Sequence, residues 1–345
     1  MRKARTATLV SLLFAALLLA LPTEDALAVS FGSFAPIDFP GAVSGTLVTG
    51  VSGGNIVGYS GGGQGFLYNG STYTNLSYPN AASTYPRSID GNNIVGDYKT
   101  VTTTIIQGKG HKTTTVTVTL DHGFRYDGST YTTLDDPLGA KINGNMQVAY
   151  DIDGTNVVGT YTDSAGLSHG YLYNGSAYTT LDNPLGIKGN IAHAISGSNI
   201  VGTYTDSAAL FHGYLYNGST YTTLNAPLGI NGTSARGIEG TNIVGDYLDS
   251  AGLRHGYLYD GSSFTTLDNP LGIKGTYATD ISGSTVVGFY YDSANLTHGF
   301  SVPFSAAPLA SFAVATVVPE PSTWVLLGIG AISLAAAAVR RRMRK

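Results

Sequence analysis

Histidine recurs in front of a Gly-aromatic pair along most of this chain, and its side chain titrates nearest to neutral pH. Five copies of this motif carry histidine and a sixth carries glutamine: His122, His169, His212, His255, His298 and Gln64. Neutral imidazoles bind divalent metals well, so these positions would form a metal-binding ring if their strands faced a common axis. We favour the alternative that each imidazole ties its strand to a neighbouring loop, and we predict neither a metal nor a cofactor.

Carboxylates follow a related pattern. An aspartate opens a loop six residues before four of these histidines, at Asp163, Asp206, Asp249 and Asp292. One aspartate per loop predicts a turn or cap, because calcium needs several oxygen atoms at one point.

Asp135 with Asp136 and Asp151 with Asp153 resemble the carboxyl pairs of glycoside hydrolysis. Neighbours on a strand point to opposite faces, and no copy of the repeat differs as a catalytic triad would, so we predict no enzyme.

The spacing of the motif defines a sequence repeat. The last three steps between copies are 43 residues each, the step before them is 47 and the earliest is 58. The unit that starts at His212 contains the hairpin-turn signal Asn217-Gly218. Alternating apolar residues around this and a second turn predict four short strands, at residues 213–216, 221–224, 235–238 and 242–247.

Six such units match a propeller, because one blade contains four antiparallel strands in about 43 residues. The first unit lacks its His-Gly-aromatic strand and begins with "SFAPIDFPG", whereas the last unit has only that strand, "HGFSVPF". Together the two ends complete the sixth blade, and a closed ring leaves no long edge exposed. We therefore predict an all-β, six-bladed propeller of four-stranded blades over residues 29–304.

One blade carries an insertion, residues 99–120, whose Thr-rich arms predict a long projecting hairpin. Its tip places Lys109 and Lys112 on an acidic body, since residues 29–339 hold ten Lys or Arg against twenty Asp or Glu. This acidity disfavours nucleic acid, which binds clustered positive charge. The basic tip suits an anionic polymer or a neighbouring molecule, unless the insertion has no role. Cysteine is absent, which excludes disulfides and thiolate metal sites.

The N-terminus has the features of an export signal. Residues 1–28 contain a basic start, an apolar stretch over residues 7–21 and small residues at Ala26 and Ala28. This pattern predicts a signal peptide that is cleaved after Ala28. A permanent membrane anchor is the alternative, and the apolar stretch is short for one.

The C-terminus combines three features in a fixed order. After a linker at residues 305–318 come the triplet Pro319-Glu320-Pro321, sixteen uncharged residues at 324–339 and a basic tail at 340–345. As a helix, the uncharged segment would be about 24 Å long at ~1.5 Å per residue, just short of the ~30 Å hydrocarbon core. The cluster Arg340, Arg341 and Arg342 would stay in the cytoplasm and leave the propeller outside.

This order of triplet, transmembrane helix and arginine cluster resembles the PEP-CTERM sorting signal of Gram-negative bacteria. The resemblance covers residues 319–345 and implies recognition of Pro319, Glu320 and Pro321 by an exosortase, a membrane protease-transpeptidase. It also implies a transient inner-membrane intermediate, followed by release or transfer to the cell surface or an exopolysaccharide matrix. A plain single-span anchor, which would keep the tail, is the alternative.

The repeat is similar to the bacterial extracellular HAF repeat, with glycine in place of alanine. The residues that carry this similarity are "HGYLY", "YTTLDNPLG" and "ISGSNIVGTY", within residues 31–304. It implies a secreted β-repeat protein and no catalytic activity. We predict a non-enzymatic structural or display protein of the cell surface or biofilm matrix. The alternative is a lectin-like, carbohydrate-binding propeller, because 23 tyrosines offer ring faces to sugars.

Overall fold

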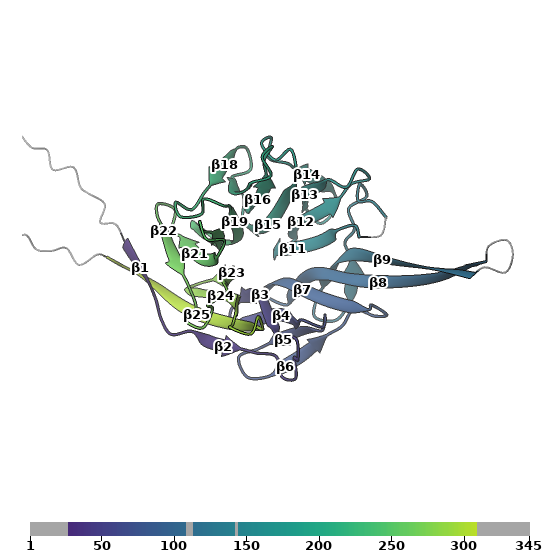
Figure 1. Ribbon diagram of the computed structural model, residues 1–345, viewed down its shortest axis with the longest axis horizontal. Coiled ribbons are helices and arrows are strands. Elements are labelled where there is room, and N and C mark those ends of the chain that lie inside the picture. The colour runs from purple at the N-terminus through teal and green to yellow at the C-terminus, as the bar shows by residue number, and fades with distance from the viewer. Residues whose placement is uncertain (1–26, 108–112, 142–143, 309–345) are drawn as a thin grey trace, which may run out of the picture. The chain divides into compact units, whose positions relative to one another are not determined.

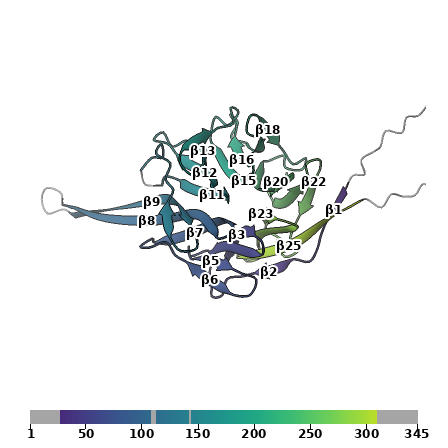
Figure 2. The same ribbon diagram turned by 180° about the vertical axis from the view of Figure 1, so that it is seen from behind.

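The described part of the chain consists of β-strands joined by turns and loops. The computed structural model describes residues 27–107, 113–141 and 144–308. Within them, Val29–Ser305 form one compact unit of six antiparallel sheets around a common axis (Figures 1 and 2). The predicted all-β, six-bladed propeller with four-stranded blades is confirmed. No helix in the described ranges is long and apolar enough to cross a bilayer, and the predicted helix at 324–339 lies outside them.

The blades are numbered here along the chain, and their strands are given from the axis outward. Blade 1 consists of β3 (Thr46–Ser52), β4 (Asn55–Ser60), β5 (Gly65–Tyr68) and β6 (Tyr73–Leu76). Blade 2 consists of β7 (Ser83–Asp90), β8 (Asn93–Gln107), β9 (Thr113–Tyr126) and β10 (Tyr131–Thr133). Blade 3 consists of β11 (Gln147–Asp153), β12 (Asn156–Thr162), β13 (Ser168–Tyr173) and β14 (Tyr178–Leu181). Blade 4 consists of β15 (Asn190–Ser196), β16 (Asn199–Thr205), β17 (Phe211–Tyr216) and β18 (Tyr221–Leu224). Blade 5 consists of β19 (Thr233–Glu239), β20 (Asn242–Leu248), β21 (Arg254–Tyr259) and β22 (Phe264–Leu267). Blade 6 consists of β23 (Thr276–Ser282), β24 (Thr285–Tyr291) and β25 (Thr297–Pro308), and its outer edge is formed by β1 (Leu27–Phe31) and β2 (Ala35–Ile37), which both pair with β25.

The blade and the sequence repeat begin at different strands. The His-Gly-aromatic strand opens the sequence repeat, but it is the third strand of each blade, as β21 is in the sheet order β19-β20-β21-β22. The innermost strands β3, β7, β11, β15, β19 and β23 contact one another in a ring. One sequence repeat therefore contributes its first two strands to one blade and its last two to the next.

The N-terminal segment closes the ring. β2 pairs antiparallel with β25, with Pro36 opposite Phe300, and β25 pairs on its other side with β24. Across the seam between blades 6 and 1, Val287 packs in one buried cluster with Val48 and Phe66. The predicted completion of the sixth blade by the two ends of the repeat region is confirmed. β1 also pairs with β25 and begins at Leu27, before the predicted cleavage site, while β25 runs four residues into the predicted linker.

A glycine in each second strand makes room for a buried aromatic ring. In blade 4 a Cβ atom at Gly202 would lie 2.6 Å from the Tyr214 hydroxyl oxygen. The Tyr214 ring therefore crosses the second strand over this glycine, and its hydroxyl donates a hydrogen bond to the Ile191 carbonyl oxygen, at 3.2 Å. Tyr171 and Tyr257 make the same bond in blades 3 and 5. The third strand of these blades is thus hydrogen-bonded to the first strand across the second one, in addition to the backbone ladders between neighbouring strands.

The insertion forms the predicted hairpin. β8 and β9 continue as one antiparallel ladder from the pair Lys99 and Asp121 to the pair Gln107 and Thr113, and they project from the ring (Figure 1). Their arms expose apolar side chains, with Ile105 at 64%. The tip residues Lys109 and Lys112 lie outside the described residues.

Ring closure predicts that the small strand β2 contributes to the stability of the propeller. Ile37 is 6% exposed and packs at the seam, whereas Val43, beyond the end of β2, is 93% exposed. Ile37→Ala should lower the free energy of unfolding of the full-length chain by about 2–5 kcal/mol, because it leaves a cavity. Val43→Ala is the matched control and should change it by less than about 0.5 kcal/mol. Equal urea midpoints for the two variants would show that β2 does not hold the ring closed.

Candidate functional site

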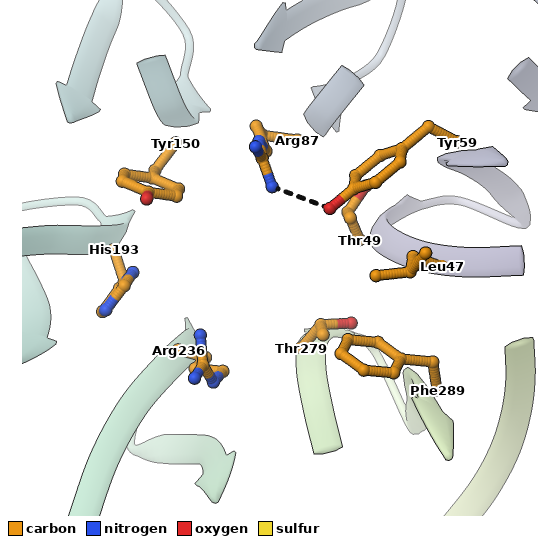
Figure 3. Close-up of a pocket in the computed structure, with 9 residues that line it drawn as sticks. All are labelled: Leu47, Thr49, Tyr59, Arg87, Tyr150, His193, Arg236, Thr279 and Phe289. Atoms are coloured by element: carbon orange, nitrogen blue, oxygen red, sulfur yellow. Dashed lines mark hydrogen bonds between the residues drawn. The ribbon is translucent and has the colours of Figure 1, made fainter. Parts of the chain in front are cut away.

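A β-bulge in each innermost strand places one side chain at the axis. The register between the first and second strands of every blade shifts at one residue: Thr49, Arg87, Tyr150, His193, Arg236 and Thr279. Bulges turn a side chain away from the regular alternation of a strand. These six residues, with Leu47, Tyr59 and Phe289, line a pocket at the centre of the ring, here called the axial pocket (Figure 3).

The six bulge residues break the symmetry of the propeller. The strands around them repeat closely, yet this position holds threonine, arginine, tyrosine or histidine. The two arginines belong to blades 2 and 5, which are three blades apart and thus opposite each other. The axial pocket is therefore the place where the blades differ in chemistry.

Arg87 is held by the strand next to its own. Its Nε donates a hydrogen bond to Asp97 on β8 at 2.7 Å, and its Nη1 donates to the Tyr59 hydroxyl at 3.2 Å. The guanidinium carbon also lies 5.1 Å from the centre of the Tyr59 ring, within the range of a cation–π interaction. Asp97 is only 2% exposed, so this pair fixes the guanidinium at the pocket wall.

Arg236 repeats this arrangement on the opposite side. Its Nε donates to one oxygen of the buried Asp246, and Arg254 donates to the other oxygen. Two guanidinium groups thus share one carboxylate. The terminal nitrogens of Arg236 make no hydrogen bond to the described residues.

His193 and Tyr150 complete the polar lining. Their rings meet edge to face with centres 5.0 Å apart. Burial, together with the positive charges of Arg236 and Arg87, lowers the pKa of His193 well below its ordinary value. The imidazole is therefore neutral at neutral pH. No side chain or backbone group in the described ranges bonds to its nitrogens or to the Tyr150 hydroxyl.

Two aspartates follow the bulge residues and link neighbouring blades. Asp151 accepts hydrogen bonds from the backbone nitrogen of Ile195 at 2.7 Å and from the Ser88 hydroxyl at 2.5 Å. Asp280 accepts from the backbone nitrogen of Val51 at 2.8 Å, across the seam of the ring. Burial raises the pKa of Asp151 to about 6, and burial together with the Asp151 charge raises the pKa of Asp280.

The carboxylates that resemble the pairs of glycoside hydrolysis, which we did not predict to be catalytic, have separate hydrogen-bond partners. Asp153 lies at the rim of a second axial cavity, where its side chain accepts a hydrogen bond from the Gly197 nitrogen of blade 4 at 2.6 Å. Asp135 instead accepts from His122 at 2.7 Å, while Asp136 is 3% exposed and accepts from the Leu138 nitrogen at 2.8 Å. Each of these carboxylates has a separate partner in the scaffold.

The repeated histidines lie away from the axis because they belong to third strands. His169 Nδ1 is 2.7 Å from Asp182, its Nε2 is 3.4 Å from Asp163, and its ring stacks on Tyr161. The same place in the other blades pairs a histidine with a carboxylate or amide, at His122–Asp135, His212–Asn225, His255–Asp268 and His298–Asp38. The structure does not bring the histidines into a ring, and the described residues contain no cluster suited to a metal ion.

The loop aspartates act as turn caps. Asp163 accepts hydrogen bonds from the backbone nitrogens of Ala165 and Leu167, at 2.8 and 2.9 Å. The equivalent bonds recur at Asp206, Asp249 and Asp292. The bond from Leu167 lowers the pKa of Asp163. Although burial opposes it, the pKa of His169 is raised by Asp182 and Asp163.

The predicted processing residues lie almost entirely outside the described residues. This holds for Ala26, for Pro319, Glu320 and Pro321, and for Arg340, Arg341 and Arg342. Ala28 falls within β1. Cleavage at the N-terminus and sorting at 319–321 therefore stay predictions from the sequence.

The axial pocket was not predicted, although the sequence contains a signal for it. The third predicted strand reads "ARGI", "AHAI" and "AYDI" in three of the units, so two adjacent positions change between a constant alanine and a constant isoleucine. The first of these two positions is the bulge residue. Each arginine at this position has an aspartate ten residues later, as in Arg87 with Asp97 and Arg236 with Asp246. This paired change marks a special contact within two blades.

The raised pKa of Asp151 predicts a specific pH dependence. As pH falls from about 7 to 5, the folded chain protonates this buried carboxyl first, since its unfolded pKa is ~3.9, and a destabilising charge disappears. Wild type should therefore gain about 1 kcal/mol relative to Asp151→Asn over this range. The control Asp127→Asn removes a carboxyl in an exposed turn, where hydrogen bonds from Thr130 and Ser129 lower the pKa, and it should run parallel to wild type over this pH range in urea denaturation. Parallel curves for all three proteins would contradict an elevated Asp151 pKa.

The ion pair of His169 with Asp182, away from the axis, predicts a second pH dependence of the free energy of unfolding. The raised pKa of His169 means that the charged His169–Asp182 pair stabilises the fold below about pH 6.5 and that this contribution is lost at higher pH. His169→Ala should cost about 1–2 kcal/mol at pH 6 and less at pH 8.5. The same substitution in an Asp182→Asn background is the matched control, because that background lacks the carboxylate that contributes most to raising the pKa of His169. Thermal unfolding at both pH values measures the difference, and an equal change with pH in both backgrounds would refute it.

Comparison with known proteins identifies a sequence motif in one segment of the chain, at its C-terminus. No curated protein matches. Among solved structures, two of the Aleuria aurantia lectin are 13% and 14% identical, with TM-scores of 0.43 and 0.45, and each aligns with 78% of this chain and 96% or 97% of its own. Trypanosoma rangeli sialidase is 10% identical, with a TM-score of 0.43 over 80% of this chain and 59% of its own. Residues 317–342 match the PEP-CTERM protein-sorting motif, so the C-terminus carries the sorting motif of exported, exosortase-processed proteins.

Proposed function

We propose that the protein is an exported, non-enzymatic propeller that an exosortase delivers to the cell surface or the exopolysaccharide matrix of a Gram-negative bacterium. The observation that carries this proposal is the PEP-CTERM motif at residues 317–342, which follows a closed propeller. The predicted signal peptide at residues 1–28 supplies the export step that such a motif requires. The mature protein then displays a stable ring outside the cell.

The order of events follows from the two end segments. The segment 324–339 would hold the chain transiently in the inner membrane, with Arg340 to Arg342 in the cytoplasm. Cleavage at Pro319-Glu320-Pro321 would then release the propeller or transfer it to a surface acceptor. The mature molecule would have no membrane segment.

A structural or display role agrees with how the polar groups are used. The repeated His-Asp pairs, the loop aspartates and the aspartates between blades each bond to a strand or turn of the ring. The carboxylates that resembled a hydrolytic pair have separate structural partners. These contacts favour a scaffold whose repeated residues hold it together.

Processing predicts a defined C-terminus for the native protein. Mass spectrometry of protein purified from its native surface fraction should show a mass that ends near residues 319–321 and starts at Val29. A strain with Glu320→Ala should instead retain the C-terminal peptides, because the triplet is the recognition element; Glu239→Ala is the control. Detection of an intact C-terminus ending in Lys345 on the native surface protein would remove the sorting proposal.

Carbohydrate binding is the second candidate, and the axial pocket is the observation that favours it. Its wall combines aromatic rings with hydrogen-bond donors that have no partner among residues 27–107, 113–141 and 144–308, a combination typical of small-ligand sites. Exopolysaccharide pull-down with the full-length chain and with a variant lacking residues 99–120 tests this function. Binding by both proteins would assign it to the propeller body, and loss in the variant would assign it to the hairpin. Absence of binding to any acidic or neutral glycan would contradict it.

A further inference from the structure

We propose that the axial pocket binds the carboxylate group of an acidic saccharide, such as a uronic acid at the end of a chain. This inference rests on the carbohydrate-binding candidate function and assigns that function a site and a ligand class. It is carried by the arrangement of Arg87, Tyr150, His193 and Arg236 around one small space (Figure 3).

The charges around the pocket leave an excess of one positive charge. Arg87 is balanced by Asp97, but Arg236 and Arg254 share the single carboxylate of Asp246. A partly buried guanidinium without a full counter-charge is costly. An anionic ligand at the axis would supply the missing negative charge, in a body that is otherwise acidic.

The free donors of the pocket suit a carboxylate. Arg236 uses Nε for Asp246 and leaves its two terminal nitrogens without partners among the described residues. The Tyr150 hydroxyl and the neutral imidazole of His193 are also free of protein partners there. A planar guanidinium binds a planar carboxylate through two parallel hydrogen bonds, and a neutral histidine adds a further donor.

The scaffold does not need these side chains at the bulge. In blades 1 and 6 the same position holds threonine, whose hydroxyl donates to a carbonyl of the next blade: Thr49 to Pro86 at 2.8 Å and Thr279 to Val48 at 3.0 Å. Threonine therefore serves the ring by linking blades. Blades 2 to 5 replace this link by arginine, tyrosine, histidine and arginine, side chains that instead point into the pocket (Figure 3).

The size of the pocket limits what it holds. It encloses about 170 Å³, less than the ~300–1,000 Å³ of sites for drug-sized ligands. One sugar unit or its carboxylate is therefore the expected occupant, with Leu47 and Phe289 against its apolar face.

Calorimetric titration of the full-length chain tests the site with glucuronate, glucose, acetate and sulfate as probes. Glucuronate should bind, and Arg236→Gln should weaken it by about tenfold or more, the loss expected for one charged hydrogen bond. Arg254 still pairs with Asp246 in this variant, so the carboxylate keeps a partner. The control Arg125→Gln, whose side chain bonds to Asn93 away from the pocket, should bind within about twofold of wild type. Thermal unfolding confirms that each variant is folded, and Tyr150→Phe and His193→Gln provide the same test if Arg236→Gln is not.

The protonation of His193 gives an independent readout. A carboxylate beside this imidazole should raise its pKa by about one pH unit or more, because a nearby negative charge favours the charged ring. NMR titration of the histidine resonances, with His193→Gln to identify the signal, measures this change with glucuronate. His212 lies on the third strand of blade 4, away from the axis, and is the internal control: its resonances should not change with glucuronate.

The outcomes separate the site from the function. Competition of acetate with glucuronate shows a carboxylate site, and tighter binding of glucuronate than of acetate identifies a saccharide as the source. No glucuronate binding, equal binding to Arg236→Gln, or a preference for sulfate or glucose overturns the inference. Polymer capture that persists in Arg236→Gln would keep the carbohydrate-binding function and reject this site. Binding of glucuronate without capture of any polymer would keep this site and reject the carbohydrate-binding function.

Discussion

The pairing of β2 with β25 is the contact on which the other features of the propeller depend. Each buried cluster joins residues of two neighbouring blades, so every blade needs a complete sheet on both sides. Blade 6 becomes complete only when residues from the start of the repeat region add its fourth strand. Once the ring is closed, six inner strands must converge, and the space that remains between them becomes the axial pocket. Closure thus creates the cavity, and the bulge residues determine its chemistry.

Two groups of residues divide the work of the blade. The glycine under the buried aromatic ring, the histidine with its carboxylate or amide partner, and the loop aspartate recur because they hold the sheet. The bulge residue is different, because its side chain leaves the ladder and faces the axis. A change there alters the pocket without altering the strands, provided that a charged residue has a partner such as Asp97 or Asp246. This explains why the arginines come with aspartates in the adjacent strand.

Much of the fold could be predicted from the sequence, because turns and alternation are local signals. The four strands of the unit that starts at His212 lie within two residues of their predicted bounds, and the complementary chain ends indicated closure. The placement of the histidines was harder, since the repeat shows neither which strand faces the axis nor where the blade begins. The role of Arg236 depended on a bulge, which the alternation of the strand does not indicate. The change of residue type at this position from blade to blade is the sequence signal for it. The predicted end segments lie outside the described residues, and the sorting motif rests on its sequence match.

The position of β25 affects how the propeller bears a mechanical load. This strand is the last described element before the C-terminal segment, and it forms ladders with β24 on one side and with β2 on the other. A pull applied through the C-terminus would therefore enter a strand that is held along both edges. Such a force shears two ladders at once, whereas a pull on an outermost strand would open one ladder a bond at a time. A propeller tethered by this end would resist flow and shear through the same blade that joins its two ends.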